Sequence, residues 1–322
     1  MRINKIKALA VFLAFSFVLV GCSADKKEEV NGDNGEATAF VTLLDVEKSE
    51  CILSRLPDGK ILLVDSGNIE DFPKVKKALD KLAVSKIDYF VLTHPDLDHV
   101  GCAEKVISEY EVGCLYTPKI IGSLTNLFPD YKSAVALAKR KGVQIKISAT
   151  SEYFKGEGYS VAFLSPHALD GIYADFNNSF DPTSTQVDDL SAVLYLDILG
   201  VRLVLTGDAG YAVEEQIVLD YNAGYFSSIY KMAEIDINLV GVDFLKVAKN
   251  GKDGATGTDF VSLLKPNSVL LPIGDAVAPS DLVLSRLYNV NPSYDLYRSD
   301  VYGNITINVI GDNTYQIITD KK

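Results

Sequence analysis

The sequence predicts an α/β protein in which two β-sheets each carry helices on their outer face. Runs rich in β-branched and apolar residues alternate with segments of helical spacing in both halves of the chain. The 322 residues are 48% hydrophobic and 23% charged, which is enough apolar material for a large packed core. We therefore expect a folded domain over residues 39–322, preceded by two regions of different character.

Residues 1–21 are predicted to be a signal peptide. Arg2, Lys5 and Lys7 precede an apolar run that ends in small residues before Cys22. The letters L-V-G-C at 19–22 resemble the bacterial lipobox, which implies cleavage before Cys22 and attachment of lipid to it. An ordinary cleaved signal or an uncleaved anchor is the alternative. In each case we expect the domain on the extracytoplasmic face of a bacterial membrane, with polar residues 22–38 as a tether.

The chain is acidic, with a formal charge of −12. Removing the three basic residues of the signal from the 31 leaves 28 against 43 acidic residues, a charge of −15. A surface of that sign repels phosphate backbones, so long nucleic acid is not an expected partner. An anionic substrate would need a metal ion or a local lysine cluster. The sequence indicates no protein partner.

Three cysteines remain if Cys22 carries lipid: Cys51, Cys102 and Cys114. An odd number excludes a complete disulfide framework. We expect three small buried thiols, with a bridge from Cys102 to Cys114 as the alternative.

The elements follow in order along the chain. The first half predicts strands at 39–46, 51–57 and 60–67, a helix over 70–84, a strand at 88–93, a helix over 99–110, a strand at 113–118, a helix over 131–141, and strands at 143–147 and 159–166. A long polar loop, 166–189, carries His167. The second half predicts a hairpin at 191–207 turning at Leu199-Gly200, helices over 211–221, 258–264 and 280–288, and strands at 243–247, 268–274, 304–310 and 313–319.

The segment THPDLDHVGC places a candidate metal site after the strand at 88–93. His94, Asp96, Asp98 and His99 form an H-x-D-x-D-H cluster, and imidazole with carboxylate suits zinc, manganese or iron. The alternative is a polar loop in which Asp98 caps a helix and the histidines bond to backbone.

Two further aspartates, Asp65 and Asp208, each follow a predicted strand. Acids at the carboxyl ends of neighbouring strands commonly converge on one site. Taken singly, each is equally a turn or cap residue.

Several motifs occur together in a fixed order between about Ala39 and Thr319. They are TLLDVEKSECILSRLPDGKILLVDSG, THPDLDHVGC, DDLSAVLYLDILGVRLVLTGDAG, DFLKVAKNG and YRSDVYGNITINVIG. This series resembles the metallo-β-lactamase superfamily, and within it the extracytoplasmic hydrolase-like domain of ComEC-type DNA-uptake proteins. The resemblance implies an αββα four-layer sandwich with a metal site at one edge, between the sheets.

The resemblance also implies roles for individual residues. The metal ligands carry over to His94, Asp96, Asp98, His99 and Asp208. Asp98 would also hold or deprotonate the attacking water. Asp65, and in the same way Asp45, would orient the ligand loop from behind it.

The chain departs from the family pattern at other positions. A His-His-Gly-Ser run has become Lys249-Asn250-Gly251-Lys252, and a Tyr-Gly-His-Pro turn has become Val277-Ala278-Pro279. The opening Gly-Gln-Gly-Asp has become residues 47–50, EKSE, and a glycine has become Cys102. We therefore expect one zinc or manganese ion, or none. His167 is a candidate replacement ligand, and the Lys249 ammonium is a candidate replacement cation that would pair with Asp98 or Asp208.

Two functions follow from these observations. The first is a lipid-anchored, metal-dependent hydrolase, with a small or cell-envelope phosphoester as the favoured substrate by resemblance. The second is a non-catalytic protein of the same fold that binds a ligand or partner at the membrane surface. The missing histidines favour the second, and the intact H-x-D-x-D-H cluster with Asp208 favours the first.

Overall fold

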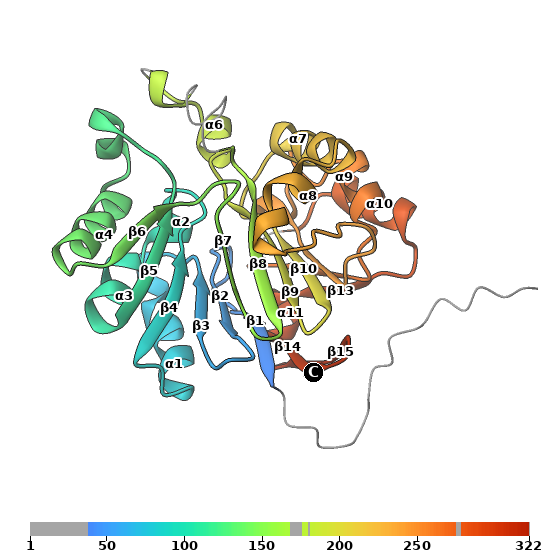
Figure 1. The fold of residues 1–322 in the computed structure, drawn as a ribbon, viewed down its shortest axis with the longest axis horizontal. Coiled ribbons are helices and arrows are strands. Elements are labelled where there is room, and N and C mark those ends of the chain that lie inside the picture. Colours follow the sequence, from blue (N-terminus) through green and yellow to red (C-terminus); the bar gives the residue numbers. More distant parts are fainter. Residues whose placement is uncertain (1–37, 168–175, 180, 275–277, 322) are drawn as a thin grey trace, which may run out of the picture.

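Two β-sheets lie face to face at the centre of the molecule, with helices on the outer side of each (Figure 1). The computed structural model describes residues 38–167, 176–179, 181–274 and 278–321. The predicted signal, Cys22, nearly all of the tether and Val277 lie outside the described residues. Among the helices described, none is both long and apolar enough to cross a membrane.

The first sheet has eight strands, and its middle supplies one side of the candidate site. The strands from β3 to β6 run parallel, whereas the others pair antiparallel. Parallel neighbours end at the same edge, so the residues after β3 and β4 lie together. In spatial order the strands are β15 (Thr314–Thr319), β14 (Ile305–Gly311), β1 (Ala39–Leu43), β2 (Ile52–Arg55), β3 (Ile61–Val64), β4 (Lys86–Val91), β5 (Glu111–Thr117) and β6 (Gln144–Ile147).

The second sheet supplies the other side of the site. Its hairpin turns at Leu199 and Gly200, as predicted, and both residues have the positive φ that a tight two-residue turn requires. The chain after the hairpin leads directly to Asp208. In spatial order the strands are β13 (Asp295–Arg298), β12 (Ser268–Leu271), β11 (Phe244–Lys246), β10 (Val201–Leu205), β9 (Val193–Ile198), β8 (Tyr159–Ser165) and β7 (Tyr153–Gly156).

Helices complete the four layers, and three of the four apolar clusters among the described residues hold the layers together. One cluster packs α1 (Phe72–Lys81), α3 (Ala103–Glu109) and α4 (Pro129–Arg140) on the first sheet. A second packs α7 (Tyr211–Asn222), α9 (Thr258–Leu264) and α10 (Asp281–Val290) on the second sheet. The third fills the space between the sheets. The predicted αββα architecture is confirmed.

The inter-sheet cluster is strongly buried. Val41 and Leu62 from the first sheet and Leu196 and Leu203 from the second have no exposed surface. Each such side chain contributes roughly 1.5–3 kcal/mol by burial. The alternation of these residues along the strands is the feature that the sequence pattern detects.

Local structure differs from the prediction at a few places. The helix expected over 99–110 is two helices, α2 (Leu97–Val100) and α3. Asp96 is the N-cap residue of α2, and its side chain makes no capping hydrogen bond, while Asp98 lies in the first turn. The alternative in which Asp98 caps the helix is therefore wrong. The short strands β7 and β13, of four residues each, were not predicted.

The three cysteines of the folded domain are free and buried, as expected. The alternative bridge between Cys102 and Cys114 is wrong. Cys102 instead directs its thiol to the carbonyl oxygen of Asn68, with Sγ and O 2.7 Å apart. This contact ties the start of α3 to the loop after β3.

A buried ion pair joins the two sheets beneath the site. Lys246 on β11 and Glu50, just before β2, are both fully buried, and Nζ of Lys246 contacts Oε2 of Glu50. The ammonium also donates to the carbonyl oxygen of Gly207 at 2.9 Å. Because an unpaired buried charge costs several kcal/mol, each side chain depends on the other.

We predict that Lys246→Met lowers the free energy of unfolding by about 3–5 kcal/mol, because it leaves the Glu50 carboxylate buried without a counter-charge. Adding Glu50→Gln should recover part of that loss. Lys60→Met is the control, because its pair with Asp58 is exposed and should change stability by about 1 kcal/mol or less. Urea unfolding measures all of these. Equal stability of the single and double variants would contradict the prediction.

Candidate metal centre

Asp65 organises the ligand loop from behind. It follows β3 with a φ of +56° and is fully buried. Its carboxylate accepts hydrogen bonds from the backbone N of Thr93 at 2.8 Å and from Thr93 Oγ1 at 2.6 Å. The same carboxylate lies 2.7 Å from Nδ1 of His99. That contact fixes the His99 ring and leaves Nε2 free for another partner, as a carboxylate does behind many metal-bound histidines.

His94 and His99 present two buried ring nitrogens without partners. Nδ1 of His94 lies 3.2 Å from Thr93 Oγ1, and the two imidazole rings are 4.0 Å apart. Within the described part of the chain, neither Nε2 atom has a hydrogen-bond partner, and both are buried. Within residues 38–167, 176–179, 181–274 and 278–321, the hydrogen bonds of the two rings all go to side chains, which is contrary to that alternative. An imidazole nitrogen buried without a partner costs free energy unless something binds it.

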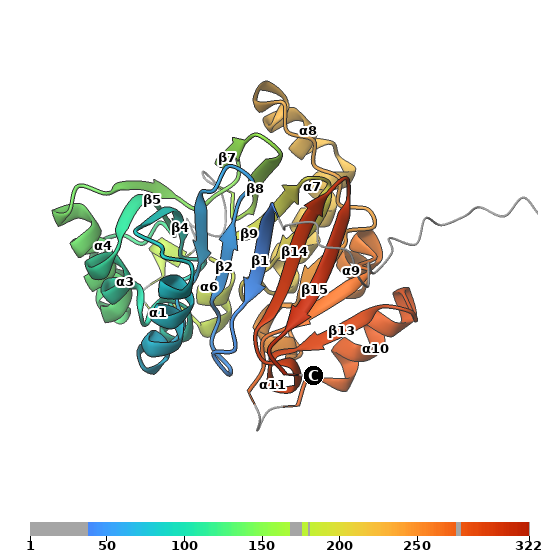
Figure 2. The same ribbon diagram turned by 90° about the horizontal axis from the view of Figure 1, so that it is seen from below.

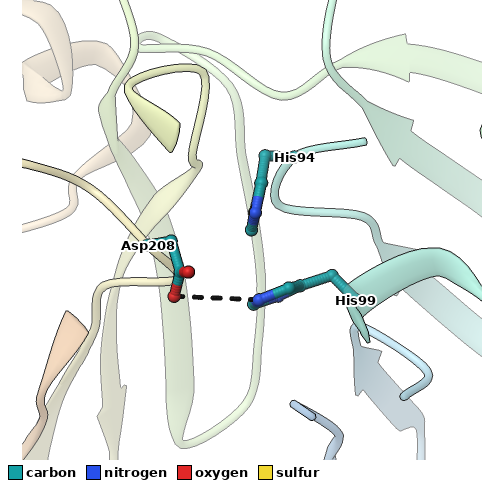
Figure 3. A group of neighbouring side chains, drawn as sticks. All are labelled: His94, His99 and Asp208. Carbon is teal, nitrogen blue, oxygen red and sulfur yellow. Dashed lines mark ion pairs between the residues drawn. The ribbon is translucent and has the colours of Figure 1, made fainter. Parts of the chain in front are cut away.

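Asp208 completes this group from the second sheet. Its Oδ1 lies 3.7 Å from Nε2 of His99, and Figure 3 shows the carboxylate opposite the two rings. Its backbone N donates to Ser191 Oγ at 3.0 Å. One ligand atom from each of His94, His99 and Asp208 lies within 4.8 Å of the others. The 3.7 Å between Nε2 of His99 and Oδ1 of Asp208 is less than twice a zinc bond of about 2.0–2.2 Å, so these two atoms could share one divalent ion.

Gly207 lets the second sheet approach the ligand loop. Its φ is +51°, and a Cβ there would lie 3.1 Å from Thr93 Cβ and 3.2 Å from Ser191 Cβ. The carbonyl of Thr93 also accepts a hydrogen bond from the backbone N of Ala192 at 3.0 Å. Thr93 is therefore the point where the loops of both sheets meet.

The protonation states of the three residues differ. Burial, followed by the nearby His99, holds the pKa of His94 well below its usual range, so His94 is a neutral imidazole suited to metal binding. Burial works against a charged His99, but Asp65 and Asp208 outweigh it and raise its pKa to about 10. Burial would raise the pKa of Asp208, but His99 and His94 hold it at about 2. A metal ion would have to displace the His99 proton.

A second group of possible ligands lies beside the first. It comprises His94, Asp96 and Asp188, the last residue of α6 (Ser184–Asp188). Burial, then repulsion from Asp98 and Asp188, raises the pKa of Asp96 to about 6. Asp188 was not singled out in the sequence, although it lies in the DDLSAVLYL motif. A third group, formed by Glu50, Asp65 and His99, is already engaged by Lys246 and Thr93.

Comparison with known proteins finds a family match for part of the chain. Residues 45–179 match the family described as the metallo-beta-lactamase superfamily. This part of the chain is thus similar to the metallo-β-lactamase superfamily, as the sequence predicts. Over 191 residues it is 26% identical to ComE operon protein 3 of Bacillus subtilis (strain 168), an alignment covering 59% of this chain and 20% of that protein. This chain thus matches only about a fifth of the length of that relative.

The solved structures that match this chain are more distant in sequence. The metallo-beta-lactamase fold protein YhfI from Bacillus subtilis has a TM-score of 0.48 at 13% identity, over 81% of this chain and 95% of that one. Igni18, a metallo hydrolase from Ignicoccus hospitalis KIN4/I, has a TM-score of 0.47 at 15% identity, over 83% and 98%. Zn²⁺-bound PqqB from Methylobacterium extorquens has a TM-score of 0.45 at 13% identity, over 80% and 86%.

The remaining predicted residues of the metallo-β-lactamase site lie at different places. Asp98 belongs to none of the three groups of possible ligands found among the described residues. Its carbonyl accepts a hydrogen bond from the backbone N of Glu50 at 3.0 Å. Its assigned role in holding water remains a prediction.

The expectations for Asp45, His167 and Lys249 need correction. The carboxylate of Asp45 contacts Nζ of Lys321 at 3.0 Å and does not support the ligand loop. His167 lies 2.7 Å from Asp220 through Nε2 and stacks on Tyr225, outside the groups of possible ligands in the described residues.

The side chain of Lys249 also has a partner other than the one expected. Its ammonium was expected at Asp98 or Asp208, but Nζ lies 2.5 Å from Oδ2 of Asp188. Its backbone N, rather than its side chain, donates to Oδ1 of Asp208 at 3.1 Å. The sequence could not supply this partner, because Asp188 lies 61 positions earlier in a polar loop.

Glu214 on α7 holds the far end of the loop that carries Lys249. It is buried, and its carboxylate accepts hydrogen bonds from the backbone N of Thr256 at 2.6 Å and of Gly257 at 2.7 Å. Burial raises its pKa to about 7, although those two bonds oppose the shift. A raised pKa contributes stability that is complete below the unfolded value of 4.5 and is lost as pH rises through about 7.

We predict that the metal-free wild-type protein loses stability between pH 4.5 and 7 relative to Glu214→Gln, by at most about 3 kcal/mol. Glutamine does not titrate, so the hydrogen bond that it loses lowers the free energy of unfolding by the same amount at every pH. Only the pH dependence of the difference between the two proteins reports on Glu214. Urea unfolding at four or more pH values measures the difference. Parallel stability curves for the two proteins would contradict the raised pKa.

Proposed function

We propose that this protein is a membrane-anchored, metal-dependent hydrolase with one divalent ion held by His94, His99 and Asp208. The observation that carries the proposal is the pair of buried Nε2 atoms that lack hydrogen-bond partners among the described residues and lie beside the Asp208 carboxylate. Two imidazoles and one carboxylate are also the ligand set of known catalytic zinc sites, which keep a fourth position for water or substrate. Zinc and manganese both suit these donors.

The chain's own residues have distinct roles in this proposal. A bound ion would polarise the scissile bond and lower the pKa of its water. Asp65 keeps the His99 ring in place through Nδ1. Asp96, at the edge of the same loop, supplies a further carboxylate near His94, with Oδ2 3.9 Å from its Nε2. Asp98 orients or deprotonates the attacking water, as the family resemblance implies.

The favoured substrate is a small or cell-envelope phosphoester. The resemblance to the ComEC-type domain is what favours a phosphodiester bond. The formal charge of −12 disfavours long nucleic acid. A small ester needs no extended basic surface, because a bound ion would supply the local positive charge.

We predict about one equivalent of zinc or manganese in the purified domain, and hydrolysis of bis(p-nitrophenyl) phosphate. His94→Ala and His99→Ala should each lose the ion and reduce hydrolysis by about 100-fold or more. His167→Ala is the matched control, because that histidine contacts Asp220 instead of the centre. Elemental analysis and a colorimetric assay give the two results.

Ion content that is the same in all four proteins would overturn the assignment of the ligands. Bound metal that depends on His94 and His99, without hydrolysis of this or other phosphoesters, would support the second function. That function is a binding protein of the same fold. The observation that favours it is Lys249, which stands where the family has a histidine and forms an ion pair with Asp188.

We also propose that Cys22 carries lipid and holds the domain on the extracytoplasmic face of a bacterial membrane. The lipobox-like L-V-G-C and the polar residues after it support this proposal. Labelled palmitate supplied to expressing cells should be incorporated into the wild-type protein and not into Cys22→Ser. Equal labelling of the two proteins, or none in the wild type, would refute it.

A further inference from the structure

A cavity of about 450 Å³ lies on the outer face of the first sheet, between α1 and the strands β1 and β14. Its volume is within the range of roughly 300–1,000 Å³ that small-molecule sites occupy. Asp45, which was expected behind the ligand loop, lines this cavity instead. None of the residues in the three groups of possible metal ligands does so. The cavity and the proposed metal centre therefore share no residue.

The cavity lies where the helices on the first sheet end. The apolar cluster that packs those helices contains no residue of β14 or β15. Leu53, Thr42, Thr306 and Ile318 form a row across β2, β1, β14 and β15, because each is paired with the next. In Figure 2, α1 lies on the β2 side of β1, away from β14 and β15. Ile318, at the far end of the row, is 46% exposed.

The floor of the cavity is apolar. Phe40, Leu44 and Leu53 come from the sheet and its loops, and Ala78 and Leu82 come from α1 and its C-terminus. Leu44 and Leu53 are buried, whereas the other three are half-buried. Apolar surface that water still reaches in a hollow is a favourable place for a hydrocarbon chain, because covering that surface releases the water.

Lysines form the rim of the cavity, in a chain whose formal charge is −12. Lys74, Lys77 and Lys81 are three and four positions apart on α1, so they lie on one side of that helix. Lys321, after β15, completes the set, and Lys74 lies 3.6 Å from Glu47. Four lysines against two aspartates make the lining locally positive, which favours an anion.

Two of these ammonium groups lack a counter-charge. Among the described residues, Lys77 and Lys81 form no ion pair, whereas Lys321 contacts Asp45 at 3.0 Å. A lysine often lies along apolar surface with its ammonium in water, and this explains a single exposed lysine. Two unpaired ammonium groups four positions apart, beside one apolar hollow, also provide charge-assisted hydrogen bonds for one anionic head group.

The strands already satisfy their own polar groups in this lining. The side chain of Asn304 accepts a hydrogen bond from the backbone N of Asp45 at 2.7 Å and donates one to Oδ2 of Asp320 at 2.7 Å. The hydroxyls of Thr42 and Thr306 bond to each other at 3.0 Å. An anion would therefore gain most at the α1 side of the cavity.

We propose that this cavity binds an anionic amphiphile with a single hydrocarbon chain, such as a fatty acid or an alkyl phosphate. The chain lies on the apolar floor, and the head group lies between Lys77 and Lys81. The hollow shape favours one inserted molecule over a flat membrane surface, which is bound by apolar side chains that protrude. The inference does not depend on the metal centre and goes beyond the proposed function.

The test uses residues 23–322, without the predicted signal and the proposed lipid on Cys22, so that no attached acyl chain competes. Fluorescent dansyl-undecanoic acid should bind saturably, and dodecanoate and dodecyl phosphate should displace it. Each two methylenes added between octanoate and dodecanoate should tighten binding about tenfold, because each buried CH₂ adds a similar free energy. Dodecylamine should not compete, because the rim lysines repel its charge. The tighter of the two anions identifies the preferred head group.

Variants locate the site. Lys77→Gln and Lys81→Gln should each weaken dodecanoate binding about fivefold. Ala78→Trp fills the cavity from a half-buried helical position and should abolish binding in a protein whose circular dichroism is unchanged. Lys76→Gln is the matched control, because Lys76 is on the same helix but pairs with Glu109 and does not line the cavity.

Failure of the anions to displace the probe from the wild type would overturn the inference. Equal displacement by dodecylamine, or the same affinity in the wild type and in the variants of Lys77, Lys81 and Ala78, would also overturn it. Binding to phosphatidylglycerol vesicles that needs Lys77 and Lys81, without displacement of the probe by the anions, would assign the lysines to a membrane surface and refute the proposed cavity ligand.

Discussion

The buried carboxylate of Asp65 is the contact on which the centre depends. It receives the backbone N and the hydroxyl of Thr93 and holds Nδ1 of His99. Through Thr93 it also reaches the second sheet, because the Thr93 carbonyl accepts a hydrogen bond from Ala192. One side chain after β3 therefore fixes the loop after β4 and the orientation of a ligand. This is possible because β3 and β4 are parallel neighbours and end at the same edge.

At the edge of the sandwich that carries the candidate metal centre, the buried carboxylates lie in pairs with basic side chains. Glu50 lies against Lys246, Asp65 against His99, and Asp188 against Lys249. Buried carboxylates repel one another unless a cation lies between them, and metal-bearing sites meet this need with the ion. In this chain Lys246, Lys249 and the proton on His99 supply most of the positive charge that the buried carboxylates need. A metal ion therefore competes with groups that already belong to the chain, which makes affinity and pH closely linked here.

The fold, and the proximity of His94 and His99 in the first group of possible ligands, could be predicted from the sequence, because local patterns encode them. Strand runs gave the two sheets, and the H-x-D-x-D-H cluster gave His94 and His99. The pairing of Lys249 with Asp188 could not be predicted, because it depends on where a polar loop returns in space. The burial of Lys246 could not be predicted, because a lysine within a strand is read as an exposed edge residue until its partner is known. His167 and Asp45 were misjudged for a related reason: residue type suggested chemistry, while position gave each another partner.

The pairing of β1 with β14 has a consequence for how the protein reaches this structure. In Figure 2 the two strands lie side by side, and Thr38 bonds to Val309 across 271 positions of sequence. Closing so long a loop is entropically costly, and folds rich in such contacts form slowly. Until β14 arrives, one edge of β1 presents unpaired amides and carbonyls to any other chain. Completion of the first sheet must therefore wait for synthesis of β14, and a folding assistant that shields β1 during that interval would raise the yield of folded protein.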